Sequence, residues 1–186
     1  MIRIGILGEI GSGKSFVAKN FGYPIFNADQ EVTKLYKKNR KVFKRLNRLL
    51  PKYITSFPIN KKEITRNILA NNSNLKKIIK IVHSEIRKKM NIFLKKNKKQ
   101  KAIILDIPLL LENKINKKND ILIFVKANKN QINKRLKKRP NFNPKILNKF
   151  KKIQLSLDYK KKKSQFIIKN NFSSKSVKVN IKNILK

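Results

Sequence analysis

Five short apolar runs alternate with helical patterns along the chain, and this alternation restricts it to few folds. Each run is rich in β-branched or aromatic residues, which is typical of strands buried on both faces. The runs cover residues 2–7, 23–26, 102–107, 121–125 and 165–168. Because helices separate them, the sequence predicts an α/β fold with three layers, in which helices cover a five-stranded parallel sheet and the crossovers are right-handed.

Helical periodicity fills the intervals between the runs. The clearest helix covers residues 73–96, where apolar residues recur on one face. The other predicted helices cover residues 14–21, 29–38, 41–50, 61–70, 129–139, 144–158 and 174–185. The interval between the second and third runs is far longer than one crossover requires, so we expect a helical insertion at residues 33–98.

Charge is the most extreme feature of the composition. The chain has 49 Lys+Arg against 9 Asp+Glu, a formal net charge of +40. Such a charge attracts polyanions, but the lysines are spread through every segment together with Asn and Ile, which indicates biased codon usage. The chain contains no cysteine, and the sequence has no apolar run that could span a membrane, so we expect a cytoplasmic protein with no membrane partner.

The first apolar run leads into "GEIGSGKS", residues 8–15, which fits the pattern G-x-x-x-x-G-K-[ST]. Glycines let successive backbone N–H groups converge on phosphate oxygens, and the following helix adds the positive end of its dipole. In this pattern Lys14 reaches the β- and γ-phosphates, and the Ser15 hydroxyl completes the Mg²⁺ shell. Since a strand precedes the motif and a helix follows it, we interpret it as a nucleotide phosphate loop.

The loop alone fits several classes of nucleotide-dependent protein. Guanine-specific GTPases generally carry an N-K-x-D motif after a later strand, and the sequence has no such tetrapeptide. The small size and the helical insertion favour a small-molecule kinase, in which the insertion holds the phosphate acceptor.

Three acidic residues follow predicted strands. Asp29, in "IFNADQEV", lies where open α/β sheets bind ligands, and its carboxylate could orient a hydroxyl and accept its proton. It could equally favour the dipole of a helix capped by Asn27. Asp106 could serve Mg²⁺ or the acceptor, or merely end its strand. Glu112 is expected to cap or pair on the surface.

Other polar residues have similarly open interpretations. His83 borders the apolar face of the long helix, where a lone histidine is usually structural, and no zinc site is expected from one histidine and no cysteine. Arg135 and Arg139 are four residues apart on a predicted helix. They could close over ATP and neutralise charge on the transferred group, or form a solvated face. The lysines at 160–163 are expected to form a solvated helix face.

Taken together, these segments resemble the dephospho-coenzyme A kinase family over residues 2–171. The family's G-x-x-G-S-G-K-[ST] pattern matches the loop, its acidic-Ala-Asp turn matches "NAD" at 27–29, and its D-[VI]-P-L-L-x-E segment matches "DIPLLLE" at 106–112. The family also has a helical histidine, arginines near a lid, a later glutamine and an "NN" pair, matched here by His83, Arg135, Arg139, Gln154, Asn170 and Asn171.

The resemblance implies a P-loop kinase-like fold that transfers the γ-phosphate of ATP to the ribose 3′-hydroxyl of dephospho-coenzyme A, with Mg²⁺. It implies a core at residues 1–32, 99–138 and 161–186, an acceptor-binding insertion at 33–98 and a lid at 139–160. The "NN" turn would then lie near the ATP adenine.

The resemblance also implies roles for individual residues. Asp29 and Lys14 are the expected catalytic residues, and Ser15 is the expected metal ligand. The expected ATP-binding residues are Gly8, Gly11, Ser12, Gly13, Lys14, Ser15, Phe16, Arg135, Arg139 and Asn170. The expected acceptor-binding residues are Asp29, Lys62, His83 and Asp106.

Six positions depart from the family's usual residues. Glycine is usual at Glu9 and Phe172, an acid at Asn27, arginine at Lys62 and Lys160, and proline at Ser84. Because Lys14, Ser15 and Asp29 are retained, we expect an active enzyme. Two other functions stay open: a related nucleoside or nucleotide kinase with another acceptor, and a basic nucleic-acid-binding ATPase. No recognised nucleic-acid motif supports the second.

Overall fold

The chain forms two compact units in the computed structural model, which describes residues 1–140 and 142–185. Asn141, in the predicted lid, and Lys186 lie outside the described residues. The first unit consists of residues 1–27, 97–143 and 149–186, and the second of residues 28–96 and 144–148.

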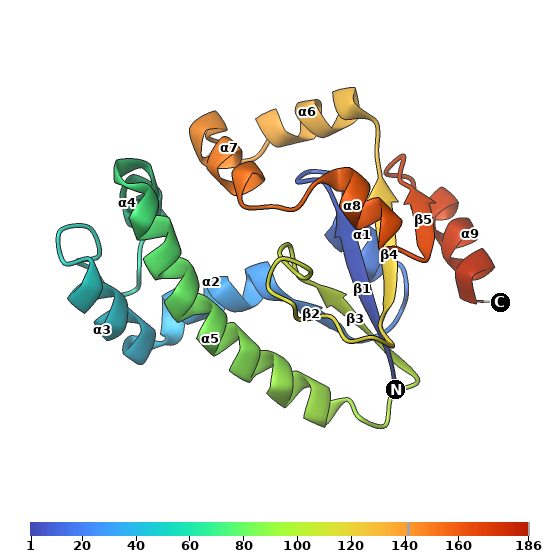
Figure 1. Ribbon diagram of the computed structural model, residues 1–186, viewed down its shortest axis with the longest axis horizontal. Helices are drawn as coiled ribbons and strands as arrows, with labels where there is room; N and C mark the ends of the chain where they lie inside the picture. The colour runs from blue at the N-terminus through green and yellow to red at the C-terminus, as the bar shows by residue number, and fades with distance from the viewer. Residues whose placement is uncertain (141, 186) are drawn as a thin grey trace. The chain divides into compact units, whose positions relative to one another are not determined.

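A five-stranded parallel sheet forms the centre of the first unit (Figure 1). Its strands are β1 (Ile2–Gly8), β2 (Ile25–Asn27), β3 (Ala102–Asp106), β4 (Ile121–Lys126) and β5 (Phe166–Lys169), in the order β2-β3-β1-β4-β5. The central strand β1 pairs with β3 on one side and β4 on the other. The predicted α/β class and the parallel sheet are therefore confirmed, and the carboxyl ends of all strands meet at one edge.

Different elements cover the two faces of this sheet. On one face, α1 (Lys14–Lys19) and α9 (Ser174–Leu185) share a buried apolar core with the strands. On the other face, Gly5 lies so close to Leu110 and Leu122 that a Cβ atom there would be 2.5 Å and 2.8 Å from their side chains. On this second face α8 (Leu157–Lys162) lies in front of the strands in Figure 1. The strands β1, β3 and β4 are thus buried along most of their length, as their composition predicts. The prediction is wrong for β5, an edge strand in which Phe166 and Ile167 are exposed and Ile168 is buried.

The predicted helix at residues 144–158 is wrong, because the segment contains two helices. The first is α7 (Pro144–Lys152), and α8 begins after Ser156, whose hydroxyl accepts a hydrogen bond from the N–H of Tyr159. Similarly, α6 (Lys129–Lys137) ends two residues earlier than predicted, so Arg139 lies beyond the helix and does not share a face with Arg135.

Four helices form most of the second unit: α2 (Ala28–Lys38), α3 (Arg40–Leu49), α4 (Lys61–Ala70) and α5 (Asn72–Lys96). The long helix α5 packs against the other three with one apolar face. Burial raises the pKa of Tyr36 in this core. Among the helices described, none combines the length and apolar character that a membrane crossing requires.

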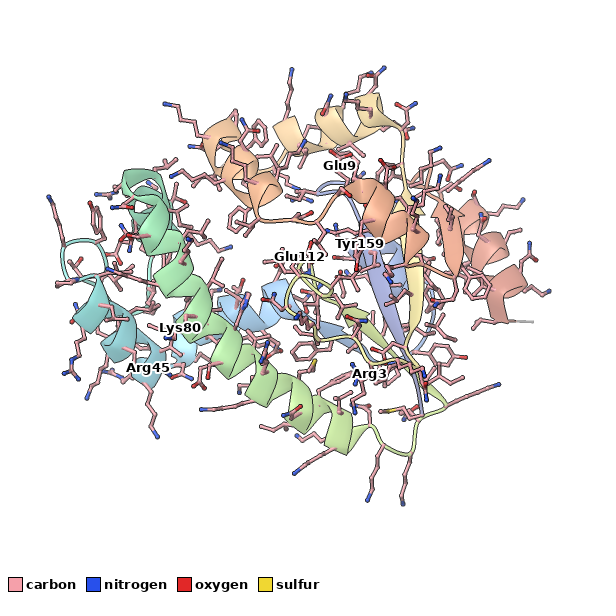
Figure 2. All side chains as sticks on the ribbon, viewed as in Figure 1. Arg3, Glu9, Arg45, Lys80, Glu112 and Tyr159 are labelled. Atoms are coloured by element: carbon pink, nitrogen blue, oxygen red, sulfur yellow. The ribbon has the colours of Figure 1, made fainter. Side chains whose placement is uncertain are left out.

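A buried ion pair fixes the start of β1 to the connection that precedes β4. The Nη2 atom of Arg3 lies 3.0 Å from Oδ2 of Asp120 and 3.1 Å from the carbonyl oxygen of Ile115. Figure 2 labels Arg3 at this end of the sheet. Burial raises the pKa of Asp120, although the Lys117 N–H and the guanidinium of Arg3 favour its charged form.

Candidate active site

The glycine loop follows β1 at the edge where the strands end. Gly8, Gly11 and Gly13 have φ angles of 143°, 91° and 87°, a region that side chains with a Cβ atom rarely adopt. Gly13 is also the N-cap of α1, and no side chain in the described part of the chain caps that end of the helix. The first backbone N–H groups of α1 therefore have no helical acceptors and can receive an anion.

Lys14 lies folded back onto this loop. Its Nζ atom donates hydrogen bonds to the carbonyl oxygens of Gly8, at 3.1 Å, and Glu9, at 2.8 Å. The ammonium group is therefore held over the centre of the loop, where a bound phosphate would meet it.

Asn27 joins two oxygen groups at the ends of neighbouring strands. It ends β2 opposite Asp106, which ends β3, and its Nδ2 atom donates a hydrogen bond to Oδ2 of that buried carboxylate. The same amide nitrogen lies 3.4 Å from the Ser15 hydroxyl. One side chain thus brings a carboxylate and a hydroxyl together, and these are the hard oxygen donors that Mg²⁺ prefers.

The turn after β5 is attached to the glycine loop. Asn170 is buried, and its Nδ2 atom donates to the carbonyl oxygen of Ser12 at 2.8 Å. Its Oδ1 atom accepts a hydrogen bond from the N–H of Phe172 at 2.9 Å. A Cβ atom at Gly13 would lie 2.7 Å from the Phe172 ring, so this turn approaches the loop as closely as glycine permits.

Arg135 extends from α6 over the Phe172 ring, with its Cζ atom 4.1 Å from the ring centroid. The Phe16 and Phe172 rings lie 6.4 Å apart between centroids. The sequence predicted that Arg135, Phe16 and Asn170 serve one ligand, and the structure brings all three around Phe172. It did not predict a role for Phe172, which was noted only as a departure from glycine.

Three residues predicted to serve the acceptor or the reaction lie in the second unit. Asp29 is exposed in the first turn of α2, and its carbonyl oxygen accepts from the Thr33 hydroxyl. Lys62 is exposed at the start of α4, and His83 is half-buried on α5. Their roles stay predictions.

Two charged pairs hold segments of the predicted lid. Oε1 of Glu9 lies 3.2 Å from Nζ of Lys151, which belongs to α7. Oε1 of Glu112, which is labelled in Figure 2, lies 2.8 Å from Nζ of Lys160. The Lys160 side chain is 1% exposed. Glu112 therefore pairs in the interior, not on the surface, and the predicted solvated face at residues 160–163 is wrong at its first lysine. Nothing in the run "KKKK" distinguishes Lys160, but Ser156 is an N-cap signal that separates α8 from α7.

Comparison with known proteins shows one family. A family model described as dephospho-CoA kinase matches residues 2–176. The dephospho-CoA kinase of Wolbachia pipientis wMel is 34% identical over 187 residues, which cover 98% of this chain and 95% of the relative. The dephospho-CoA kinase of Rickettsia felis is 33% identical, with coverage of 90% of this chain and 87% of the relative.

Solved structures show the same fold. A crystal structure of a Thermus thermophilus protein has a TM-score of 0.76 and 24% identity, and covers 99% of this chain and 96% of its own. The dephospho-CoA kinase from Campylobacter jejuni has a TM-score of 0.63 and 21% identity, with coverage of 98% and 95%. The deoxyadenosine kinase from M. mycoides has a TM-score of 0.54 and 17% identity, with coverage of 100% and 99%.

Proposed function

The chain belongs to the dephospho-CoA kinase family, and we propose that the loop at residues 8–15 and the side chains around it transfer the γ-phosphate of ATP to the ribose 3′-hydroxyl of dephospho-CoA. The products are CoA and ADP, which makes this the last step of CoA biosynthesis. The observation that carries the proposal is the glycine loop at the carboxyl edge of the sheet. Beside this loop, the Asn27 amide donates hydrogen bonds to both the Ser15 hydroxyl and the Asp106 carboxylate. The cytoplasm stays the predicted compartment.

The loop binds the phosphates of ATP. Backbone N–H groups at the start of α1 point to the anion, and Lys14 exchanges its two loop carbonyls for β- and γ-phosphate oxygens. Arg135 and Arg139 add positive charge from α6 and the segment after it, where they neutralise charge on the phosphoryl group as it is transferred.

Ser15 and Asp106 fit a Mg²⁺ ion that ATP brings with it. Mg²⁺ in nucleotide sites is held by one or two protein oxygens together with phosphate oxygens and water. The Ser15 hydroxyl and the Asp106 carboxylate share one neighbour, the Asn27 amide, so both lie within reach of one small region. When bound, the metal neutralises phosphate charge and aligns the transferred group.

Asp29 orients the acceptor hydroxyl and accepts its proton. It follows Asn27 by two residues, so its Cα atom lies at most about 7 Å from that of Asn27 by chain geometry alone. Asn27 in turn contacts Ser15, the residue assigned to the metal. Lys62 and His83, on the packed helices α4 and α5, bind the remainder of the acceptor.

The test is product formation with a matched acidic control. Purified protein is incubated with Mg·ATP and dephospho-CoA, or with adenosine or AMP as acceptor, and products are identified by mass spectrometry. Asp29→Asn should reduce CoA formation by about 10²-fold or more, since a lost catalytic carboxylate costs about 10²–10⁴-fold. Glu31→Gln alters the other acid in the first turn of α2, which pairs with Lys34, and should retain activity.

Each outcome decides between the functions left open. If phosphorylated adenosine or phosphorylated AMP forms and CoA does not, the acceptor is a nucleoside or nucleotide and not dephospho-CoA. ATP hydrolysis stimulated by RNA, with no phosphorylated small molecule, would favour the nucleic-acid-binding ATPase. Equal loss of activity in Asp29→Asn and Glu31→Gln would mean that α2, not the Asp29 carboxylate, was disturbed.

A further inference from the structure

Phe172 has a backbone conformation that its side chain disfavours. Its φ angle is 64°, in the left-handed region, where glycine is at ease and a bulky residue is a clear outlier. Such a residue persists only where the surrounding contacts hold it, and outliers of this kind gather at ligand sites. A glycine or asparagine here would adopt the same backbone without that disadvantage, so the phenyl ring itself needs an explanation.

The backbone of this turn is held independently of the ring. The Oδ1 atom of Asn170 accepts the Phe172 N–H at 2.9 Å, and its Nδ2 atom donates to Ser12 in the glycine loop at 2.8 Å. The buried Asn170 side chain therefore fixes the turn against the loop through two hydrogen bonds. Neither bond uses an atom of the phenyl ring.

The ring contacts the parts of the site that handle the nucleotide. Its edge lies against Gly13, the residue before Lys14, and its centroid is 6.4 Å from that of Phe16 on α1. The Arg135 guanidinium lies over its face, with Cζ at 4.1 Å. A cation–π contact occupies no hydrogen-bond acceptor, so guanidinium N–H donors stay available for anions.

We propose that Phe172 is a positioning residue that holds the Arg135 guanidinium beside the glycine loop for ATP. The proposal rests on the assignment of Arg135 to ATP under the proposed function. Arg135 is exposed, and without the ring its long side chain would sample many rotamers, each of which ATP would have to suppress on binding. The ring confines the side chain beforehand, so that affinity for ATP is higher.

The experiment compares equilibrium ATP binding, by calorimetry, among the wild type, four variants at Phe172 and Arg135, and one control variant. Phe172→Asn removes the ring with a residue that tolerates the left-handed backbone, and Phe172→Tyr keeps the ring. Arg135→Gln removes the guanidinium, and the double variant completes a thermodynamic cycle. Phe166→Thr, which removes a 37% exposed ring from β5, is the matched control.

We expect Phe172→Asn to raise the Kd for ATP about three- to tenfold, the range of a cation–π contact plus restricted rotamers. Phe172→Tyr and Phe166→Thr should retain most of the affinity for ATP. In the Arg135→Gln background, Phe172→Asn should raise the Kd for ATP little further. The KM for ATP should rise while the KM for dephospho-CoA stays constant. Thermal unfolding of each variant shows whether the fold is kept.

Two results would overturn the proposal. One is an ATP Kd for Phe172→Asn equal to that of the wild type. The other is full additivity with Arg135→Gln, because independent effects exclude an action through the guanidinium. Wild-type protein that binds ATP but forms no CoA would instead contradict the proposed acceptor, and the binding ratios would still decide the role of Phe172.

Discussion

Removing one partner of the buried pair of Lys160 and Glu112 should strongly destabilise the first unit, because the other charge then stays buried and unpaired. Lys160 Nζ lies 2.8 Å from Oε1 of Glu112 and 3.1 Å from Oε1 of Gln154, and the two charged side chains are 1% and 9% exposed. The same Glu112 oxygen accepts the Leu155 N–H at 2.9 Å. The pair thus joins the segment after β3, the connection between α7 and α8, and α8 itself.

Lys160→Met keeps most of the aliphatic side chain and removes the ammonium group. Glu112 is then a buried carboxylate whose Oε1 keeps the Leu155 N–H and whose Oε2 makes no hydrogen bond within the described residues. Breaking a buried pair on one side costs about 3–5 kcal/mol, and the remaining N–H favours the lower end of that range. At about 2–4 °C per kcal/mol for a chain of this size, about 3 kcal/mol lowers Tm by about 6–12 °C.

Urea unfolding followed by circular dichroism, together with thermal scans, measures this loss. Lys161→Met replaces the next, exposed lysine of the same helix and should stay within about 0.5 kcal/mol of the wild type. Glu112→Gln in the Lys160→Met background removes the stranded charge and should recover most of the stability. Equal free energies of unfolding for Lys160→Met and Lys161→Met, or no recovery in the double variant, would refute the reasoning.

Three further changes test other parts of the first unit. Asn27→Asp places a second carboxylate against Asp106 in place of an amide donor, so we expect about 1.5–3 kcal/mol of destabilisation near neutral pH. In thermal scans, acid or added Mg²⁺ should raise the Tm of this variant again. A Tm that neither acid nor Mg²⁺ changes would contradict the prediction. Gly13→Ala adds a Cβ atom at a φ of 87° and into the side chains of the turn after β5, and should abolish measurable ATP binding in calorimetry. Asp120 has a raised pKa in the folded chain, so its contribution to stability is complete below the ordinary carboxyl pKa and is lost as pH rises through the folded value. Asp120→Asn should remove that decline in the free energy of unfolding, measured by urea titrations across pH. An unchanged dependence on pH would exclude this carboxyl as the source of the decline.

Local patterns were sufficient to predict the sheet and the loop. The strands β1, β3 and β4 are buried along most of their length, so their apolar runs stand out from a chain in which lysine and asparagine dominate the remainder. The loop is predictable because glycines and Lys14 recur at a spacing that the phosphate chemistry dictates. In both cases the physical cause acts over a few consecutive residues.

The errors are of two kinds. The ends of α6 and α7 were predicted too late although a local signal, the N-cap Ser156, separates α7 from α8, and the other errors concern contacts between residues distant in the sequence. Lys160 is one of four consecutive lysines, and its ion pair with Glu112, 48 positions earlier in the chain, distinguishes it in space from the three exposed ones. The Asn27 amide has a partner because β2 lies beside β3, a pairing that an insertion of several helices conceals. Phe172 departs from the family's glycine, but its cation–π contact with Arg135 depends on how α6 and the turn after β5 meet.

The hydrogen bonds of Lys14 to the loop carbonyls affect which ligands the loop favours. Its ammonium already has the carbonyl oxygens of Gly8 and Glu9 as acceptors, so a ligand must replace these partners and does not meet a bare charge. A triphosphate can make that exchange, because charged oxygens are stronger acceptors than carbonyls. A nucleoside without phosphates has no charged oxygen acceptor, so Lys14 keeps its hydrogen bonds to the two carbonyl oxygens. The two carbonyl contacts of Lys14 therefore favour anionic ligands over neutral ones, and this preference requires no steric clash.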